Sequence, residues 1–203
     1  MDSFEKLVEA FRQLPGIGPR QARRFAYYVV GRGTSYANEL SSLLRDAQKA
    51  VFLCEKCKRF FEPKAGEKAC SICRDSSRQT GQLMIVAKDS DMISIEKSGA
   101  YKGKYFILGG IVPVLEKEPA KKIRQSELLK LVVSMKETES LREVILAFST
   151  NHDGESTVAY LETILRDFGL TISELGRGLS TGSELEYADK ETLRFALQNK
   201  KAH

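Results

Sequence analysis

The chain has 203 residues, 42% of them hydrophobic, which suffices for one large domain or for two small ones joined by a module. The net charge of +5 is uneven: residues 1–80 contain 15 Lys/Arg against 9 Asp/Glu, whereas residues 81–203 contain 17 against 18. No apolar run approaches the roughly 18 residues that a membrane span requires, and the acidic start is unlike a secretion signal. We therefore expect a cytoplasmic protein that makes no membrane contact. Its basic half indicates either a polyanionic partner or an ordinary solubilising surface.

Helices dominate the basic N-terminal part. Asp2 and Glu5 have the spacing of a capping box, and apolar residues then recur at helical intervals. Pro15 ends this helix, because proline has no N–H to continue the hydrogen-bond ladder. Three helices are predicted, from Asp2 to Leu14, from Pro19 to Gly31 or Gly33, and from Ser35 to Val51.

The turn between the first two helices has the chemistry of an anion site. Glycine amides and a helix N-terminus both present N–H donors, and arginines that lie outside the apolar stripe add positive charge. This arrangement suits DNA phosphates and has no evident means of reading bases. The alternative is a plain hairpin turn with solvated arginines. The candidate DNA-binding residues are Gly16, Ile17, Gly18, Arg20, Arg23 and Arg24.

Four cysteines follow, in two Cys-x-x-Cys pairs separated by twelve residues. This is the spacing of a closed tetrahedral zinc site, in which each pair forms a knuckle that supplies two thiolates. Disulfides or free buried thiols are the alternatives. The predicted ligands of one structural Zn²⁺ are Cys54, Cys57, Cys70 and Cys73. Phe60 and Phe61, in the loop between the pairs, are expected to cover the metal rather than to stack on bases.

Strands and helices alternate after the cysteines, which predicts a parallel sheet with helices outside. We expect strands at residues 83–87, 105–108, 143–148 and 170–175, and helices after Asp89–Asp91, at 126–135, at 156–168 and after Asp189. Asp89–Asp91 and Asp189 are expected to cap the helices that follow them. The short last helix must pack on another element, such as a second subunit.

Asp153 and Glu155 follow the third predicted strand, at the edge where parallel sheets bind ligands. An Asp-x-Glu pair at such an edge can hold magnesium. It can equally be the acidic first turn of a helix.

These modules, in this order, resemble the RecR family of bacterial recombination mediators. The resemblance also covers Glu143–Ala147, the turn Asp153-Gly-Glu-x-Thr157, and the tail Arg177-Gly-Leu-x-x-Gly-x-x-Leu-Glu-Tyr187. It implies an α+β multi-module protein with four parts. These are a helix-hairpin-helix domain at 1–52, a four-cysteine zinc finger at 53–78, a Toprim-like α/β domain at 79–175, and a C-terminal loop and helix at 176–203.

The resemblance also implies a non-enzymatic role in DNA repair. Such a protein works with RecO-like, and in many bacteria RecF-like, partners to help load RecA onto single-stranded DNA. It forms a homo-oligomer, a dimer or a tetrameric ring, through its helical N-terminus and C-terminal part. Its location would be cytoplasmic and nucleoid-associated.

Three positions depart from the family pattern. Ala87 stands where a glutamate is usual, Ser183 replaces the second glycine of a Gly-Gly pair, and the loop 111–119 lacks a Ser-Pro-Leu-Asp-Gly sequence. Because the acidic Toprim surface helps to bind RecO in the family, we expect an altered partner contact. A magnesium-dependent Toprim nuclease or primase-like enzyme remains the alternative, and Ala87 argues against it. A zinc-ribbon interaction module with incidental DNA binding is a weaker third hypothesis.

Overall fold

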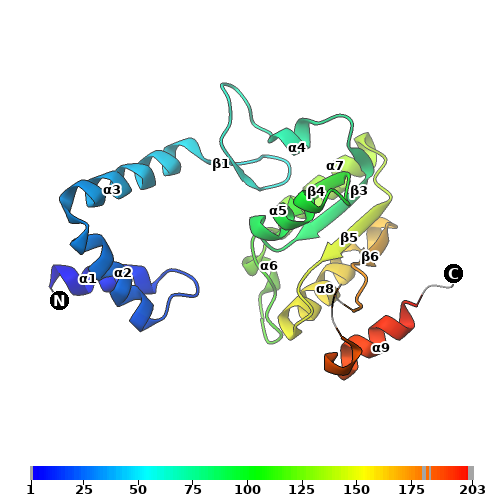
Figure 1. Cartoon of the computed structure of the whole chain (residues 1–203). Helices are drawn as coiled ribbons and strands as arrows, with labels where there is room; N and C mark the ends of the chain where they lie inside the picture. Colours follow the sequence, from blue (N-terminus) through cyan, green and yellow to red (C-terminus); the bar gives the residue numbers. More distant parts are fainter. Residues whose placement is uncertain (1, 180–181, 183, 201–203) are drawn as a thin grey trace. The chain divides into compact units, whose positions relative to one another are not determined.

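The computed structural model of the chain describes residues 2–179, 182 and 184–200. It divides into two compact units, Met1–Phe52 and Leu53–His203 (Figure 1). In the described part no helix is both long enough and apolar enough to cross a membrane. Ser183, one of the departures from the family pattern, lies outside the described residues.

The first unit consists of three helices, as the sequence predicts: α1 (Ser3–Arg12), α2 (Pro19–Gly31) and α3 (Gly33–Ala50). Asp2 caps α1 by accepting a hydrogen bond from the Glu5 N–H at 2.8 Å. The reciprocal half of the expected capping box is replaced by another contact, because the Glu5 carboxylate binds the Arg23 guanidinium at 2.7 and 3.0 Å. Glu5 therefore ties α1 to α2.

The core of this unit is small. Val8, Ala22 and Ala26 are its buried residues, and Phe4, Leu7, Phe11 and Ile17 pack around them. Alanine at positions 22 and 26 has no bulk beyond Cβ, which lets α1 and α2 approach closely. On α3 two large apolar side chains stay exposed, since Leu43 is 59% and Leu44 65% accessible.

The second unit is built on a four-stranded parallel sheet, which confirms the predicted fold class (Figure 1). Its spatial order is β4-β3-β5-β6, so β4 and β6 form the edges. The strands are β3 (Gln79–Val86), β4 (Gly103–Ile107), β5 (Glu143–Ala147) and β6 (Thr171–Glu174). The connecting helices are α5 (Asp89–Ser98), α6 (Pro119–Lys122), α7 (Gln125–Thr138) and α8 (His152–Leu165), the last extended by the 3-10 helix η1 (Arg166–Phe168).

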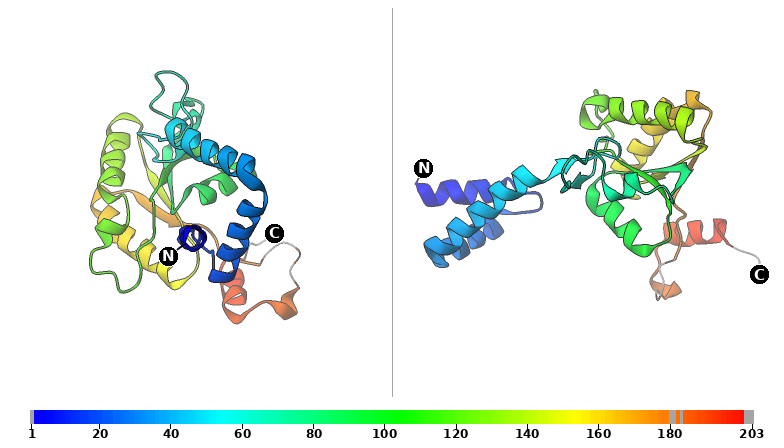
Figure 2. Two further views of the ribbon diagram at one scale, coloured as in Figure 1. Left: turned by 90° about the vertical axis from the view of Figure 1, so that its left-hand side faces the viewer. Right: turned by 90° about the horizontal axis from the view of Figure 1, so that it is seen from above.

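The two faces of the sheet bury different cores. Leu83 and Ile85 of β3 pack with residues of α7 and α8, such as Val132 and Leu161. Their neighbours on β3, including Met84, pack with α5 and with the four cysteines. Side chains alternate between faces along a strand, so β3 contributes to both cores. Figure 2 shows α7 and α5 on opposite sides of the sheet.

Short elements accompany the cysteines: β1 (Phe52–Leu53), β2 (Phe60–Phe61) and α4 (Ser71–Arg74), of which α4 contains Cys73 and is capped by Cys70. The tail contains the 3-10 helix η2 (Leu185–Tyr187) and the helix α9 (Lys190–Gln198). Asp189 caps α9 as predicted, because its carboxylate accepts from the N–H groups of Glu191 and Thr192.

The predicted cap of α5 is wrong. The N-cap residue is Lys88, which makes no side-chain capping bond, and Asp89 is the first helical residue. The Asp89 carboxylate instead accepts from the Phe60 N–H at 2.8 Å. This bond joins the loop between the cysteine pairs to α5.

Helix α8 starts four residues earlier than predicted, so Asp153 and Glu155 lie in its first turn. Gly154 between them is buried, and a Cβ there would lie 1.9 Å from the Ser149 carbonyl oxygen. Only glycine therefore fits at position 154 without a shift of the backbone.

We expect Gly154→Ala to destabilise the α/β unit by about 1–3 kcal/mol, because the backbone of the strand-to-helix turn must shift to relieve the overlap. Urea unfolding followed by circular dichroism measures the change. Gly178→Ala is the matched control, since a Cβ there would meet no atom within 4 Å. Equal midpoints for the two variants would show that the turn tolerates the methyl group.

Candidate functional site

The four predicted ligands converge. Cys54, Cys57, Cys70 and Cys73 are all buried, and their sulfur atoms lie within 4.8 Å of one another. In a tetrahedral site with metal–sulfur bonds of about 2.3 Å, two sulfurs lie about 3.8 Å apart, and Cys57 and Cys70 are separated by 3.6 Å. Within the described residues this is the one group of three or more His, Cys, Asp or Glu close enough to hold a metal. The geometry fits a closed metal centre.

The thiols interact strongly with one another. Hydrogen bonds from Cys57 and Cys70 lower the pKa of the Cys54 thiol, to which the Cys70 N–H also donates at 3.3 Å. The same contact with Cys54 raises the pKa of Cys57. One thiolate thus opposes ionisation of the next, so four thiolates at these distances require a cation. Coordination by a divalent metal supplies that charge.

The two aromatics of the intervening loop behave differently from each other. Phe61 packs against the cluster that contains the cysteines, as expected for a residue that covers the metal site. Phe60 is 53% exposed and contributes its backbone N–H to Asp89. Covering the site is therefore the role of Phe61 alone.

The glycine turn of the first unit has open approaches. Gly16 adopts the left-handed region, with φ +76°, and the Ile17 N–H donates back to the Leu14 carbonyl at 3.1 Å. Gly18 is the N-cap of α2, Pro19 follows at its first position, and a Cβ on Gly18 would meet no atom within 4 Å. The first-turn N–H groups of a helix have no carbonyl partner within that helix. These donors lie beside open space, where an anion can reach them.

The three candidate arginines differ in their contacts. Arg23 forms the bidentate pair with Glu5, which raises the pKa of its guanidinium. Arg20 and Arg24 are exposed and make no ion pair with any residue that the structure describes. Both line a surface hollow of about 710 Å³, together with Gly18, Pro19 and Gln21. Two uncommitted cations thus flank the helix N-terminus, while Arg23 braces the two helices.

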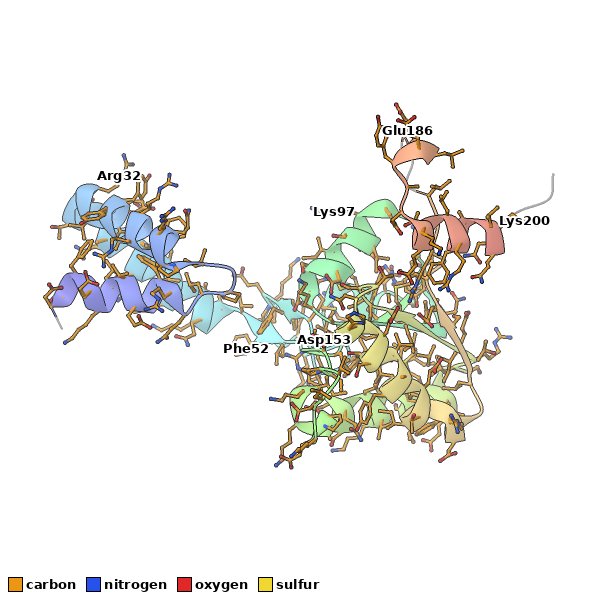
Figure 3. The ribbon with its side chains drawn as sticks, turned by 90° about the horizontal axis from the view of Figure 1, so that it is seen from below. Arg32, Phe52, Lys97, Asp153, Glu186 and Lys200 are labelled. Atoms are coloured by element: carbon orange, nitrogen blue, oxygen red, sulfur yellow. The ribbon has the colours of Figure 1, made fainter. Side chains whose placement is uncertain are left out.

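The acidic pair at the beginning of α8 is engaged within its own unit; Figure 3 labels Asp153 there. The Asp153 carboxylate accepts from the Val114 N–H at 3.3 Å. Glu155 lies 3.2 Å from the guanidinium of Arg177, which also approaches Glu174 at 3.6 Å. Ala87 follows β3 at the same carboxyl edge and adds no carboxylate. This arrangement agrees with the interpretation of the pair as first-turn acids.

Sequence reasoning missed the role of Arg177. Its guanidinium also lies 4.8 Å from the centre of the Phe195 ring, and its carbonyl accepts from the Asn199 side chain at 2.8 Å. Arg177 therefore connects β6 and the first turn of α8 to α9. Glu174 lies only three residues before Arg177, but Glu155 and Phe195 are brought to Arg177 by the fold, so no spacing signal exists for those two contacts.

These features define a class of protein: a basic helical hairpin combined with a four-cysteine cluster that can hold a metal and an α/β unit with a parallel sheet. Three family models match successive parts of the chain. The model described as "RecR, helix-hairpin-helix" matches residues 4–48, the Toprim domain model matches 81–176, and "RecR, C-terminal" matches 178–201.

Full-length relatives lead to the same family. The chain is 34% identical to the recombination protein RecR of Gloeobacter violaceus over 97% of this chain and 95% of that protein. It is 32% identical to the protein of that name from Cutibacterium acnes, over 97% and 94%, and 33% identical to that of Chlorobium limicola, over 98% and 97%. The chain therefore belongs to the RecR family.

We expect Arg177→Ala to loosen α9, because the variant loses the ion pair with Glu155 and the cation–π contact with Phe195. Each of these two contacts contributes about 0.5–1 kcal/mol. Amide hydrogen exchange in residues 190–198 should accelerate about tenfold. Arg194→Ala is the matched control. It lies over the same Phe195 ring at 5.0 Å, but its ion pair is with Glu191 of the same helix. Unchanged exchange in the Arg177 variant would show that other contacts hold α9.

Proposed function

We propose that this chain is a recombination mediator in DNA repair that has no catalytic activity and binds DNA through its helical hairpin. The observation that carries the proposal is the position of Arg20 and Arg24, which have no ion partner among the described residues, beside the open N-terminus of α2 in a member of the RecR family. Backbone donors of the Gly16–Gly18 turn would bind one phosphate oxygen, and the guanidinium groups would bind its neighbours. Such contacts position a protein on DNA without reading sequence.

One structural Zn²⁺ is proposed for the cysteine cluster. Four thiolates are soft ligands that favour zinc in a tetrahedral arrangement, and all four positions are filled by protein, which leaves none open for catalysis. The ion would stabilise a segment that contains two two-residue strands and a four-residue helix.

A homo-oligomer, either a dimer or a tetrameric ring, is part of the proposal. Apolar side chains on the helical unit, among them Tyr27, Tyr28, Val30, Leu43 and Leu44, are more than half exposed. A second apolar group in the tail includes Leu185, Tyr187 and Leu197. Exposed apolar residues of this number are typical of subunit contacts. The proposed setting is the cytoplasm near the nucleoid, with RecO-like and RecF-like partners in the loading of RecA onto single-stranded DNA.

The enzyme hypothesis has less support. A magnesium-dependent Toprim nuclease or primase needs a set of carboxylates that is free to take up the ion. Here position 87 is alanine, Asp153 accepts from a backbone N–H, and Glu155 is paired with Arg177. We infer that the acidic edge serves partner binding and internal packing.

Replacing both Arg20 and Arg24 with Glu should abolish DNA binding, because two phosphate-attracting charges become repulsive. Each single Ala variant should lower the slope of log K against log salt by about one, equally for all sequences. Binding isotherms at several salt concentrations measure both effects.

The matched control carries the same charge change on the same unit, with Arg45 and Lys49 of α3 replaced by Glu. It should retain most of the binding. If the Arg20/Arg24 double variant binds like the parent, the hairpin is structural and DNA binds elsewhere. Arg23→Ala should alter the salt slope less than either neighbour, because Glu5 already neutralises its charge.

Calorimetric titration of the parent with Mg²⁺ should show no tight single-site isotherm. Asp153→Asn and Glu155→Gln should leave DNA binding nearly unchanged, because both acids lie within the α/β unit, far in sequence from the hairpin. Both variants should weaken binding to a RecO-like partner, because we assign partner binding to the acidic edge. A tight isotherm in the parent that both variants lose would favour the enzyme hypothesis instead.

A further inference from the structure

Lys104 is a buried cation in the middle of an apolar strand. All five residues of β4 are buried, and Lys104 is only 8% exposed. Its Nζ donates to the carbonyl oxygens of Asp75 at 2.8 Å and of Ile72 and Cys73 at 3.3 Å. These three acceptors use all three donors of the ammonium group. A lysine at such a position needs an explanation, because burying a charge is costly.

The three carbonyls belong to the second cysteine knuckle. Ile72 and Cys73 lie in α4, and Asp75 is its C-cap. Carbonyls at the end of a helix have no partner within it, so the ammonium group satisfies acceptors that would otherwise be unpaired. Lys104 therefore fixes the backbone that carries Cys73, a predicted metal ligand.

Neutral carbonyls alone do not balance a buried positive charge. No carboxylate of a described residue forms an ion pair with Lys104 within 4.0 Å, and the Asp75 carboxylate, which Lys104 attracts from farther away, is shared with Ser77 and Arg78. Cys73 lines the same small hollow as Lys104. One divalent zinc with four thiolates carries a net charge of −2. A neighbouring buried ammonium is attracted to this charge, because the interior screens it weakly.

The first knuckle is attached to the same strand. The Ile107 N–H of β4 donates to the Cys57 carbonyl at 2.8 Å. The Arg124 guanidinium donates to the carbonyls of both Lys58 and Ile107 at 3.1 Å. Strand β4 is an edge of the sheet, and this Ile107 N–H lies on the side of β4 that has no partner strand. Each knuckle thus rests on β4, one through Ile107 and the other through Lys104.

We propose that Lys104 is a positioning residue and counter-charge for the metal centre: its ammonium group orients the second knuckle and offsets the negative charge of the metal–thiolate cluster. The metal centre and the parallel sheet then share their stability through β4. This inference rests on the zinc assignment of the proposed function and is independent of DNA binding.

The test compares Lys104→Met, Lys104→Gln and the control Lys102→Met, which alters an exposed lysine two residues away. Zinc affinity is measured at one pH by competition with a chromogenic chelator. We expect both Lys104 variants to bind zinc about 10- to 100-fold more weakly than the parent, as for other residues that support metal ligands. Lys102→Met should stay within about twofold of the parent, because the Lys102 side chain is exposed and forms no hydrogen bond or ion pair with the described residues of the knuckle.

The paired substitutions separate charge from hydrogen bonding. Glutamine retains N–H donors without the charge, so parent-like zinc affinity in Lys104→Gln would overturn the counter-charge role. Methionine lacks both the donors and the charge, so parent-like zinc affinity in Lys104→Met would overturn the positioning role as well. Saturation with Co²⁺ should give the absorption bands of a tetrahedral four-thiolate site in every variant, showing that the ligands still assemble. If elemental analysis finds no zinc in the folded parent, the zinc assignment fails first, and this outcome is distinct from the failure of Lys104.

Discussion

The burial of four cysteine sulfurs side by side is the constraint on which the arrangement of the second unit depends. Sulfur atoms within 4.8 Å of one another can all ionise only around a cation. The surrounding elements are too short to stand alone, with two residues in each of β1 and β2 and four in α4. The segment would therefore rely on the proposed metal ion and on its contacts with β4. In return the Cys57 carbonyl pairs with the Ile107 N–H of an edge strand, a backbone group that would otherwise be open to other chains.

The two units carry opposite electrostatic roles. In the helical unit, Glu5 neutralises Arg23 and leaves Arg20 and Arg24 beside the glycine turn without ion partners among the described residues. In the α/β unit, the single guanidinium of Arg177 is shared between Glu155 and Glu174 at the carboxyl edge of the sheet. The pair of Glu5 with Arg23 therefore leaves Arg20 and Arg24 available to phosphate. The pair of Arg177 with Glu155 occupies a carboxylate that a divalent ion would need. Both pairings favour DNA binding over metal-dependent chemistry.

Tail attachment gives the acidic edge a structural use. Arg177 lies between Glu155 of α8 and Phe195 of α9, and Asn199 returns to its carbonyl. A charge at the sheet's edge therefore helps to place a helix with an exposed apolar surface that includes Leu197. In the proposed oligomer, the position of α9 would determine what that surface can contact. Partner binding at the acidic edge and assembly through the tail would then be physically linked.

The sequence by itself determined the features that local spacing encodes. The two Cys-x-x-Cys pairs predicted the metal ligands, and the Pro-Gly-Ile-Gly-Pro turn predicted the hairpin. The alternation of apolar strands with helices predicted the parallel sheet. Each of these sequence signals is carried by residues that are close in the chain. Only the tertiary structure decided the partners of charged side chains. Arg23 with Glu5, Arg177 with Glu155, and Lys104 with the carbonyls after Cys70 join residues 18 to 32 positions apart. No local period reports such pairs, since they depend on how finished elements pack against one another.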